Sequence, residues 1–590
     1  MSNKQFHLER KHNVELKSDI INNIDIQSLK RKITVPNESN YAAMEFVLHS
    51  TPSVVSAAST SSDVEGPTKN KQFRIDTTQF KQSSVQDGGS RAAEITNKIL
   101  FMLTKDNMAF EAIEKEGFKL FIKSVAPLYK LPSRETIINL MEEKYKALST
   151  IIKAELSSVE YLSLTTDIWE DRLNFRLYFG VTSHYIFNNQ HKSVTIGVTE
   201  LTERQSAKYF ETWLLDVTNE WKIRKENIVV VVSNAGSHIQ KAIKDAFGND
   251  KYLACFGNSL NLIPSKVIEL PVIKSISNKI RTIFTYFKRS TTAADKLKTS
   301  IDLKLIQYFS SQWISTYNML QMFIDLSDVI KEILLQCRTA PTMITASELE
   351  TVKESVNLLK PFLDAIKTIS AEPYLMASKA IPVVNTLKTS LNALQPKTEI
   401  GSKMKKLLLE QFREGFNFIE NEIILSISTV LDPRFKNIHF KNDLAYFKTI
   451  GNISRALYTR ELHKRPIQNN STSTNIKNDF WSYHRELVNT IKIQDTVHSN
   501  DNEMQVDLRY YLVQPPIDIN SCPIQFWNSD NTVLGKLGRK YLSAVATSFP
   551  GERIFSKPGR IILESRCRLS TQHLRQLFFL ESLSSEDWQL

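Results

Sequence analysis

The chain has 590 residues, of which 75 are Lys or Arg and 63 are Asp or Glu, so its formal net charge is +12. This length exceeds what one compact core supports, so we expect two or more domains, and the basic charge weakly favours a polyanionic partner. No run of 18 apolar residues is present, which argues against a membrane-spanning helix. The four cysteines lie far apart without a CxxC pair, which argues against a zinc site and a disulfide framework.

The first part of the chain is polar, and helices follow it. Residues 1–91 are rich in Ser, Thr and Gly, and we expect this low-complexity segment to be disordered because it buries too little apolar surface to fold alone. Residues 92–158 show helical periodicity, so we predict a helical N-terminal domain there. Within this domain Ser133, which follows Leu-Pro, has the position of a helix N-cap.

The next part, residues 159–263, has the pattern of a β-sheet with helices. The strand candidates are YLSLTTDIW (161–169), FRLYFGVTSHYIF (175–187), SVTIGVTEL (193–201), NIVVVVS (227–233) and KYLACF (251–256). Helical stretches lie at 208–221 and from about residue 238. The apolar run of the fourth candidate is typical of a strand buried on both faces. This order of elements resembles the core of the ribonuclease-H-like fold, in which polynucleotidyl transferases carry carboxylates at the ends of adjacent strands.

The remainder of the chain is predicted to be helical. From 264 to 529 nearly every stretch has helical character, with a break at VLDPRFK (430–436), where Pro433 separates two helices. Residues 530–590 form a last helical part, in which we predict helices over LGKLGRKYLSAVATS (534–548) and STQHLRQLFFLESL (570–583).

Seven motifs in one order resemble the blocks of the hAT transposase family, especially the branch with the BED zinc-finger domain-containing proteins, many of which are transposase-derived. The motifs are LTTDIW (164–169), VVVVSNAGSHIQKAI (229–243), CFGNSLNLI (255–263), YFKRSTTAADKL (286–297), QWISTYNML (312–320), VLDPRFK (430–436) and LGRKYLSAVATSFPGERIFSKPGRIILESRCRLS (537–570). The resemblance implies a ribonuclease-H-like domain interrupted by a large helical insertion, and a C-terminal dimerisation region that completes the core. It also implies a nuclear protein that forms homodimers.

The family's DNA cleavage and strand transfer use three carboxylates that hold divalent metal ions, usually Mg²⁺. By resemblance the first acid is Asp167 and the third is Glu552, so these two are the expected metal ligands and catalytic residues. The second acid belongs at the end of the fourth strand, where this chain has Ser233 and then Asn234. A neutral hydroxyl is a poor ligand for Mg²⁺. We therefore predict a vestigial catalytic site and expect no bound cofactor, with Mg²⁺ required if the site is active.

Two further motifs depart from the family pattern. The block that usually has Cys-x-x-His has Cys255 and Asn258, and the Arg-Trp pair at the start of the insertion is Gln312-Trp313. By resemblance Trp313 stacks on a flipped DNA base, but a buried core position is an equal alternative. Lys288 and Arg289 are candidates for DNA contact, although charged residues on helices are usually only solvated.

Residues 1–92 contain no cysteine, so we expect no BED zinc finger in this chain. Three functions stay open. The first is a transposase-derived nuclear protein with a degenerate catalytic site, which acts through DNA binding, dimerisation or both. The second is an active transposase, and the third is a protein-interaction module without nucleic-acid contact.

Overall fold

The computed structural model describes residues 89–171, 176–202, 206–233, 236–300, 313–371, 374–458, 506–548 and 570–588, with a few positions between 481 and 487. These residues belong to one compact unit, Ile75–Leu590. The predicted low-complexity segment lies almost entirely outside the described residues, and so does Glu552. The predicted domain boundaries stay predictions.

The N-terminal region is helical, as the sequence predicted. It contains α3 (Ser90–Lys105), the 3-10 helix η1 (Phe110–Glu114), α4 (Glu116–Val125) and α5 (Arg134–Ser158). Ser133 caps α5, because its hydroxyl accepts a hydrogen bond from the Thr136 backbone N–H at 3.2 Å. One face of α5, including Ile137 and Met141, is fully buried against the sheet side of the protein.

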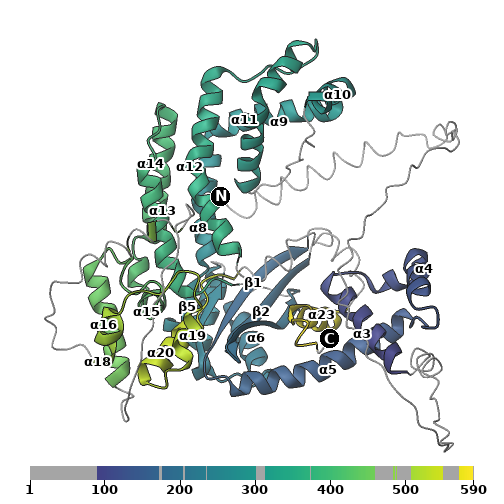
Figure 1. The fold of residues 1–590 in the computed structure, drawn as a ribbon, viewed down its shortest axis with the longest axis vertical. Helices are drawn as coiled ribbons and strands as arrows, with labels where there is room; N and C mark the ends of the chain where they lie inside the picture. The colour runs from purple at the N-terminus through teal and green to yellow at the C-terminus, as the bar shows by residue number, and fades with distance from the viewer. Residues whose placement is uncertain are drawn as a thin grey trace, which may run out of the picture. The chain divides into compact units, whose positions relative to one another are not determined.

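The central sheet has five strands in the order β3-β2-β1-β4-β5 (Figure 1). The elements of this region are β1 (Leu162–Asp171), β2 (Arg176–Phe187), β3 (Gln190–Glu200), α6 (Ala207–Glu220), η2 (Lys225–Asn227), β4 (Ile228–Ser233), α7 (Ser237–Phe247), η3 (Asn249–Lys251) and β5 (Tyr252–Ala254). The first three strands pair antiparallel, whereas β4 is parallel to β1 and β5 is parallel to β4. All five predicted strands are therefore present.

Strand β4 is buried on both faces, as its apolar run predicted. Because side chains alternate along a strand, Val230 and Val232 enter one hydrophobic core while Val231 enters the other. The first core is shared with the helices that follow the sheet, and the second is shared with the N-terminal helices. The sheet therefore lies between two layers of helices.

A long part follows the sheet in which the described elements are all helices, as predicted. Its elements are α8 (Phe256–Ile268), α9 (Pro271–Arg289), α10 (Thr291–Ser300), α11 (Trp313–Leu335), α12 (Ala346–Ala371), η4 (Ala377–Lys379), α13 (Ala380–Ala393), α14 (Glu399–Phe416), η5 (Ile419–Asn421), α15 (Ile423–Val430) and α16 (Asp443–Tyr458). The break predicted at Pro433 is present, because α15 ends at Val430 and α16 begins at Asp443.

The C-terminal part contains α18 (Val506–Val513), α19 (Pro523–Asn528), α20 (Val533–Leu542) and α23 (Thr571–Ser582). Helix α23 lies against β3 and α5, and its Leu577 and Phe579 are buried in the same core as the sheet. The predicted helix over residues 534–548 is wrong in its second half, because α20 ends at Leu542. Residues 543–548 instead make backbone hydrogen bonds to distant segments: the Ala546 N–H donates to the Leu375 carbonyl at 2.8 Å.

The break at residues 430–436 is a buried polar centre as well as a helix boundary. The carboxylate of Asp432 is fully buried and forms a bidentate pair with the Arg434 guanidinium, with N···O distances of 2.9 and 2.6 Å. The Ser378 hydroxyl in η4 donates to the same carboxylate at 2.7 Å. On α19, Trp527 Nε1 donates to the Leu431 carbonyl at 2.8 Å. This centre therefore connects the helical part to the C-terminal helices.

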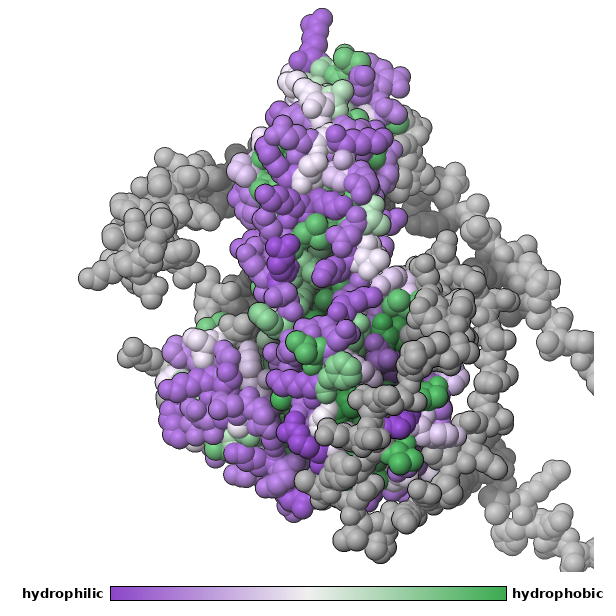
Figure 2. All heavy atoms as spheres, turned by 90° about the vertical axis from the view of Figure 1, so that its left-hand side faces the viewer, coloured by the Kyte–Doolittle hydropathy of each residue, from purple (hydrophilic) through white to green (hydrophobic). Residues whose placement is uncertain are grey.

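The described surface is mostly polar on the face drawn in Figure 2, where hydrophobic side chains form only small separate groups. Among the helices that the structure describes, none combines the length and the apolar character that a membrane crossing requires.

Candidate functional site

Asp167 lies on β1, the strand in the middle of the sheet. Asp167 pairs with Gly180 on β2. Thr166, the residue before Asp167, pairs with Ser233, the last residue of β4. Because β1 and β4 are parallel, the end of β4 lies beside the part of β1 that carries Asp167. The sequence-predicted positions of the first and second acids are therefore neighbours on adjacent strands.

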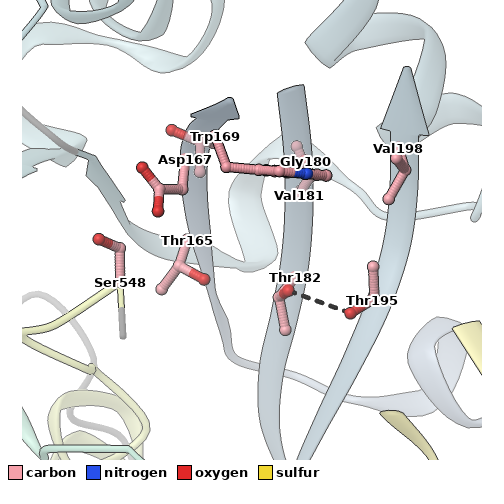
Figure 3. A pocket seen from close by; sticks show the side chains of 10 residues that line it. Thr165, Asp167, Trp169, Gly180, Val181, Thr182, Thr195, Val198 and Ser548 are labelled. Carbon is pink, nitrogen blue, oxygen red and sulfur yellow. Dashed lines mark hydrogen bonds between the residues drawn. The ribbon is translucent and has the colours of Figure 1, made fainter. Parts of the chain in front are cut away.

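A small cavity of about 20 Å³ lies next to Asp167, with room for about one water molecule. It is lined by Thr165, Thr166, Asp167, Trp169, Gly180, Val181, Thr182, Thr195, Val198 and Ser548. Figure 3 shows the Asp167 carboxylate on the same side of β1 as Ser548, while Trp169 extends across Gly180. Asp167 is only 7% exposed, and its Oδ1 accepts a hydrogen bond from the Ile168 N–H at 2.9 Å.

Gly180 opposite Asp167 is required by the packing of Trp169. A Cβ atom at Gly180 would lie 2.7 Å from Trp169 Cζ3, which is closer than side chains tolerate. The indole stacks on Tyr178 with ring centroids 5.8 Å apart and meets Phe578 of α23 edge-on at 6.0 Å. Trp169 is therefore a packing residue that forms one wall of the cavity.

Ser233 is completely buried at the end of β4, and its carbonyl accepts a hydrogen bond from the Cys255 N–H at 2.9 Å. The residue at the end of the strand next to β1 is thus neutral, and its register partner on β1 is Thr166, the residue before Asp167. Asp245, the next acidic residue after Ser233 in the sequence, does not supply a carboxylate here, because it is exposed near the far end of α7. Asn234 lies outside the described residues.

The extended segment 543–548 brings the C-terminal part of the chain to this cavity. The Ser163 hydroxyl donates to the Ser543 carbonyl at 3.0 Å, and the Phe256 N–H donates to the Ala546 carbonyl at 2.9 Å. These bonds fix the segment beside β1 and the start of α8, so that Ser548 reaches the cavity wall. Glu552 comes four residues later in the sequence and lies outside the described residues.

A row of neutral polar side chains crosses three strands behind the cavity. Thr165 Oγ1 lies 2.9 Å from His184 Nε2, and His184 Nδ1 lies 2.7 Å from Ser193 Oγ. Burial, and to a smaller extent the nearby His191, lowers the pKa of His184 to about 3. The ring is therefore neutral at pH 7, with one nitrogen donating and the other accepting.

Sequence reasoning missed Thr165, Ser548 and His184. Thr165 could have been found, because it is two residues from Asp167 and side chains two apart on a strand share a face. Ser548 and His184 carry no local signal, since their places depend on contacts with residues far away in the sequence.

The described residues do not fit a two-metal centre. Mg²⁺ prefers carboxylate oxygen, and the cavity offers one carboxylate, that of Asp167, beside hydroxyl groups. Within the described ranges, no three His, Cys, Asp or Glu side chains are grouped as ligands for a metal ion. The other predicted ligand, Glu552, is not among these residues.

The residues predicted to contact DNA lie in the helical part. Trp313, the first residue of α11, is 3% exposed, and its Nε1 donates to Asn261 Oδ1 on α8 at 3.1 Å. In this structure Trp313 is a core residue, which is one of the two roles that the sequence left open, and its face is not accessible to a base. Lys288 and Arg289 are exposed in the last turn of α9. Cys255 is buried, as expected of a small hydrophobic side chain.

Two family models match the chain. The ZBED1 RNase-like helical domain matches residues 253–359, and the hAT family C-terminal dimerisation region matches residues 507–584. The first match begins at β5 and extends into α12, and the second covers α19, α20, α23 and nearly all of α18.

Two curated relatives are similar over most of the chain, and a third over a smaller part of it. Zinc finger BED domain-containing protein 4 of Homo sapiens is 22% identical over 83% of the chain and 43% of its own length. The putative AC transposase of Zea mays is 23% identical over 81% of the chain and 63% of its own length. The Hobo transposase of Drosophila melanogaster is 24% identical over 38% of the chain and 36% of its own length. The chain thus spans less than two thirds of each of these proteins. The chain is therefore similar to hAT-family transposases, and its residues 507–584 match the C-terminal dimerisation region of that family.

Proposed function

We propose that this chain is a transposase-derived protein with a degenerate catalytic site, which acts in the nucleus through DNA binding and as a homodimer. The observation that carries the proposal is Ser233. It is fully buried beside the strand of Asp167, so the second position of the acid constellation holds a neutral group.

The strand order supports a ribonuclease-H-like domain with a helical insertion. Three antiparallel strands are followed by two parallel ones in the order β3-β2-β1-β4-β5, and the long helical part lies between β5 and the C-terminal segment. That segment returns to the sheet twice, through residues 543–548 and through α23. In such a domain Asp167 and Glu552 are the vestigial acids.

A lost carboxylate removes catalysis for an electrostatic reason. Two Mg²⁺ ions are held close together only if several anionic oxygens offset their mutual repulsion. With Ser233 the site has one negative charge fewer, and a hydroxyl does not replace it. We therefore infer that any Mg²⁺ at Asp167 is bound too weakly to support cleavage.

The test is metal-dependent nicking of supercoiled and hairpin DNA by the full chain. We expect wild type not to nick DNA with Mg²⁺ or Mn²⁺, and Ser233→Asp to gain nicking. Ser233→Asn is the control, because Asn has the shape of Asp without its charge, and we expect this variant not to nick DNA. As a second measurement, Mg²⁺ should raise the melting temperature of Ser233→Asp but not that of wild type or Ser233→Asn. If wild type nicks DNA, and Asp167→Asn or Glu552→Gln abolishes nicking, the chain is an active transposase and the proposal is wrong.

DNA binding is tested by retention on non-specific duplex DNA at increasing salt. Phosphate contacts release counterions, so affinity should fall steeply with ionic strength. Replacing exposed Lys288 and Arg289 by Glu should lower the salt slope by about 2, roughly one for each lost phosphate contact. Retention that is absent even at low salt would favour the interaction module without nucleic-acid contact.

A further inference from the structure

Helix α4 in the N-terminal region leaves most of its apolar side chains in solvent. Ile122 is the buried residue of this helix, and it belongs to the core that the sheet shares with the N-terminal helices. Leu120, Phe121 and Val125 are 61%, 60% and 62% exposed. Figure 1 draws α4 at the outer edge of the N-terminal helices. The helix is therefore held by one face while its other apolar residues remain uncovered.

The uncovered residues have the spacing of a helix-packing face. Gly117, Leu120, Phe121, Ser124 and Val125 are all exposed, and they occupy positions i, i+3, i+4, i+7 and i+8. This spacing places them on one side of an α-helix, the side that normally packs on another element. Small residues lie among large ones, and a Cβ atom at Gly117 would meet no other atom within 4 Å. We call these five residues the α4 face.

One flank of the α4 face is basic. Lys119 and Lys123 are both exposed, and because they are four residues apart they lie one above the other along the helix. At 3.6 residues per turn they lie on the side of Leu120. Residues 116–130, which are the helix and the turn after it, contain three lysines and one glutamate, Glu116, so their formal charge is +2. The α4 face therefore combines exposed apolar side chains with positive charge at one edge.

This combination selects one kind of partner. An amphipathic helix with acidic residues beside its apolar stripe matches both the apolar side chains and the lysine flank. Nucleic acid supplies negative charge but no aliphatic surface for Leu120 and Phe121. Two copies of α4 packed antiparallel would bring the lysine flank against itself, which is repulsive. A membrane surface needs no relief, whereas the small residues Gly117 and Ser124 provide grooves that the ridges of a helix fill.

We propose that the α4 face is the docking surface for an acidic amphipathic helix of another protein. The apolar stripe of that helix covers Leu120, Phe121 and Val125, and its carboxylates lie beside Lys119 and Lys123. Helix α4 lies outside both family-model matches, so this surface is separate from the matched dimerisation region. The inference goes beyond DNA binding and homodimer formation, and it depends on neither.

The experiment measures the binding of fluorescein-labelled peptides to the full-length chain by fluorescence anisotropy. The probe is a synthetic peptide of about 20 residues, about 30 Å long as a helix, that repeats Leu-Glu-Glu-Leu-Leu-Glu-Gln. A second peptide has Gln in place of every Glu, and a third has Lys in place of every Glu. We expect the Glu peptide to bind about 5-fold more tightly than the Gln peptide, because two exposed ion pairs each add a modest amount. The Lys peptide should bind more weakly than both.

The chain supplies a matched control for the apolar contact. Phe121→Ser should weaken binding of the Glu peptide by about 10-fold, because an aromatic side chain at the centre of a contact contributes most of its affinity. Phe418 is 70% exposed and lies outside α4, so Phe418→Ser makes the same chemical change elsewhere on the surface and should bind like wild type. Both variants should keep the melting temperature of wild type, because both side chains are exposed. Lys119→Glu combined with Lys123→Glu should reverse the preference, so that the Lys peptide binds more tightly than the Glu peptide.

Equal affinity of wild type for the Glu and Lys peptides, or an equal loss of affinity in Phe121→Ser and Phe418→Ser, would overturn the inference. Two further measurements test the other occupants. If wild type binds vesicles of phosphatidylcholine and phosphatidylserine and Phe121→Ser does not, the α4 face binds a membrane. If light scattering gives a lower mass for Phe121→Ser than for wild type, a second copy covers the face. Either of these results also overturns the inference.

Discussion

Replacing Asp432 by Asn should destabilise the protein strongly. The carboxylate is fully buried and accepts four hydrogen bonds, from the Arg434 backbone N–H, from Arg434 Nε and Nη2, and from the Ser378 hydroxyl, at 2.6 to 3.0 Å. The amide keeps the shape but removes the negative charge that faces a guanidinium only 5% exposed. Breaking a buried ion pair from one side costs about 3–5 kcal/mol, a large part of the stability of a typical domain.

The assay is urea unfolding followed by tryptophan fluorescence. Trp527 donates to the carbonyl of Leu431, next to the substituted residue, so its emission should report on this region directly. The matched control is Glu399→Gln, which makes the same chemical change in the exposed pair of Glu399 with Lys403. We expect no measurable change for the control, because exposed pairs contribute little.

A double variant separates the lost charge from the lost packing. Asp432→Asn combined with Arg434→Met removes both buried charges, so it should be less destabilised than Asp432→Asn alone. The reasoning would be refuted if Asp432→Asn unfolded at the same urea concentration as Glu399→Gln, or if the double variant were the less stable of the two.

Two further predictions concern other buried groups. Burial lowers the pKa of His184 in the folded protein to about 3. Below about pH 6.5 the unfolded chain therefore binds a proton at this ring and the folded protein does not. The contribution of the neutral ring to the free energy of unfolding is complete above pH 6.5 and is lost as the pH falls toward 3. Between pH 7 and pH 5 this loss is about 2 kcal/mol. In His184→Gln, the decrease in the free energy of unfolding between these two pH values should be smaller by that amount, as measured by urea unfolding. An unchanged decrease would contradict the prediction. Trp313→Ala should lower stability by about 3–5 kcal/mol, because it empties a core position, and Trp313→Phe should lower it less. If Trp313→Ala instead weakened DNA retention at unchanged melting temperature, the base-stacking role would be favoured.

Much of the fold could be predicted from the sequence because the relevant signals are local. The β-branched and aromatic residues of β2 and β3, the apolar run of β4 and the N-cap Ser133 each lie within a dozen consecutive residues, and the structure has these elements where they were expected. The candidate site was predicted less completely. Asp167 and Ser233 are neighbours across β1 and β4, and the motif order anticipated this, but the hydroxyl-lined cavity around them was not foreseen.

The sequence by itself determined the type and order of the elements, the family relationship, and the neutral residue at the end of β4. Only the tertiary structure decided that residues 543–548 leave the helix, since their backbone groups bond to Leu375 and Phe256, about 170 and 290 residues away. It also decided that Trp313 is buried on α8 and that α18 keeps one apolar face exposed. Periodicity shows which side chains share a face, but what covers that face depends on packing between segments that are far apart in the chain.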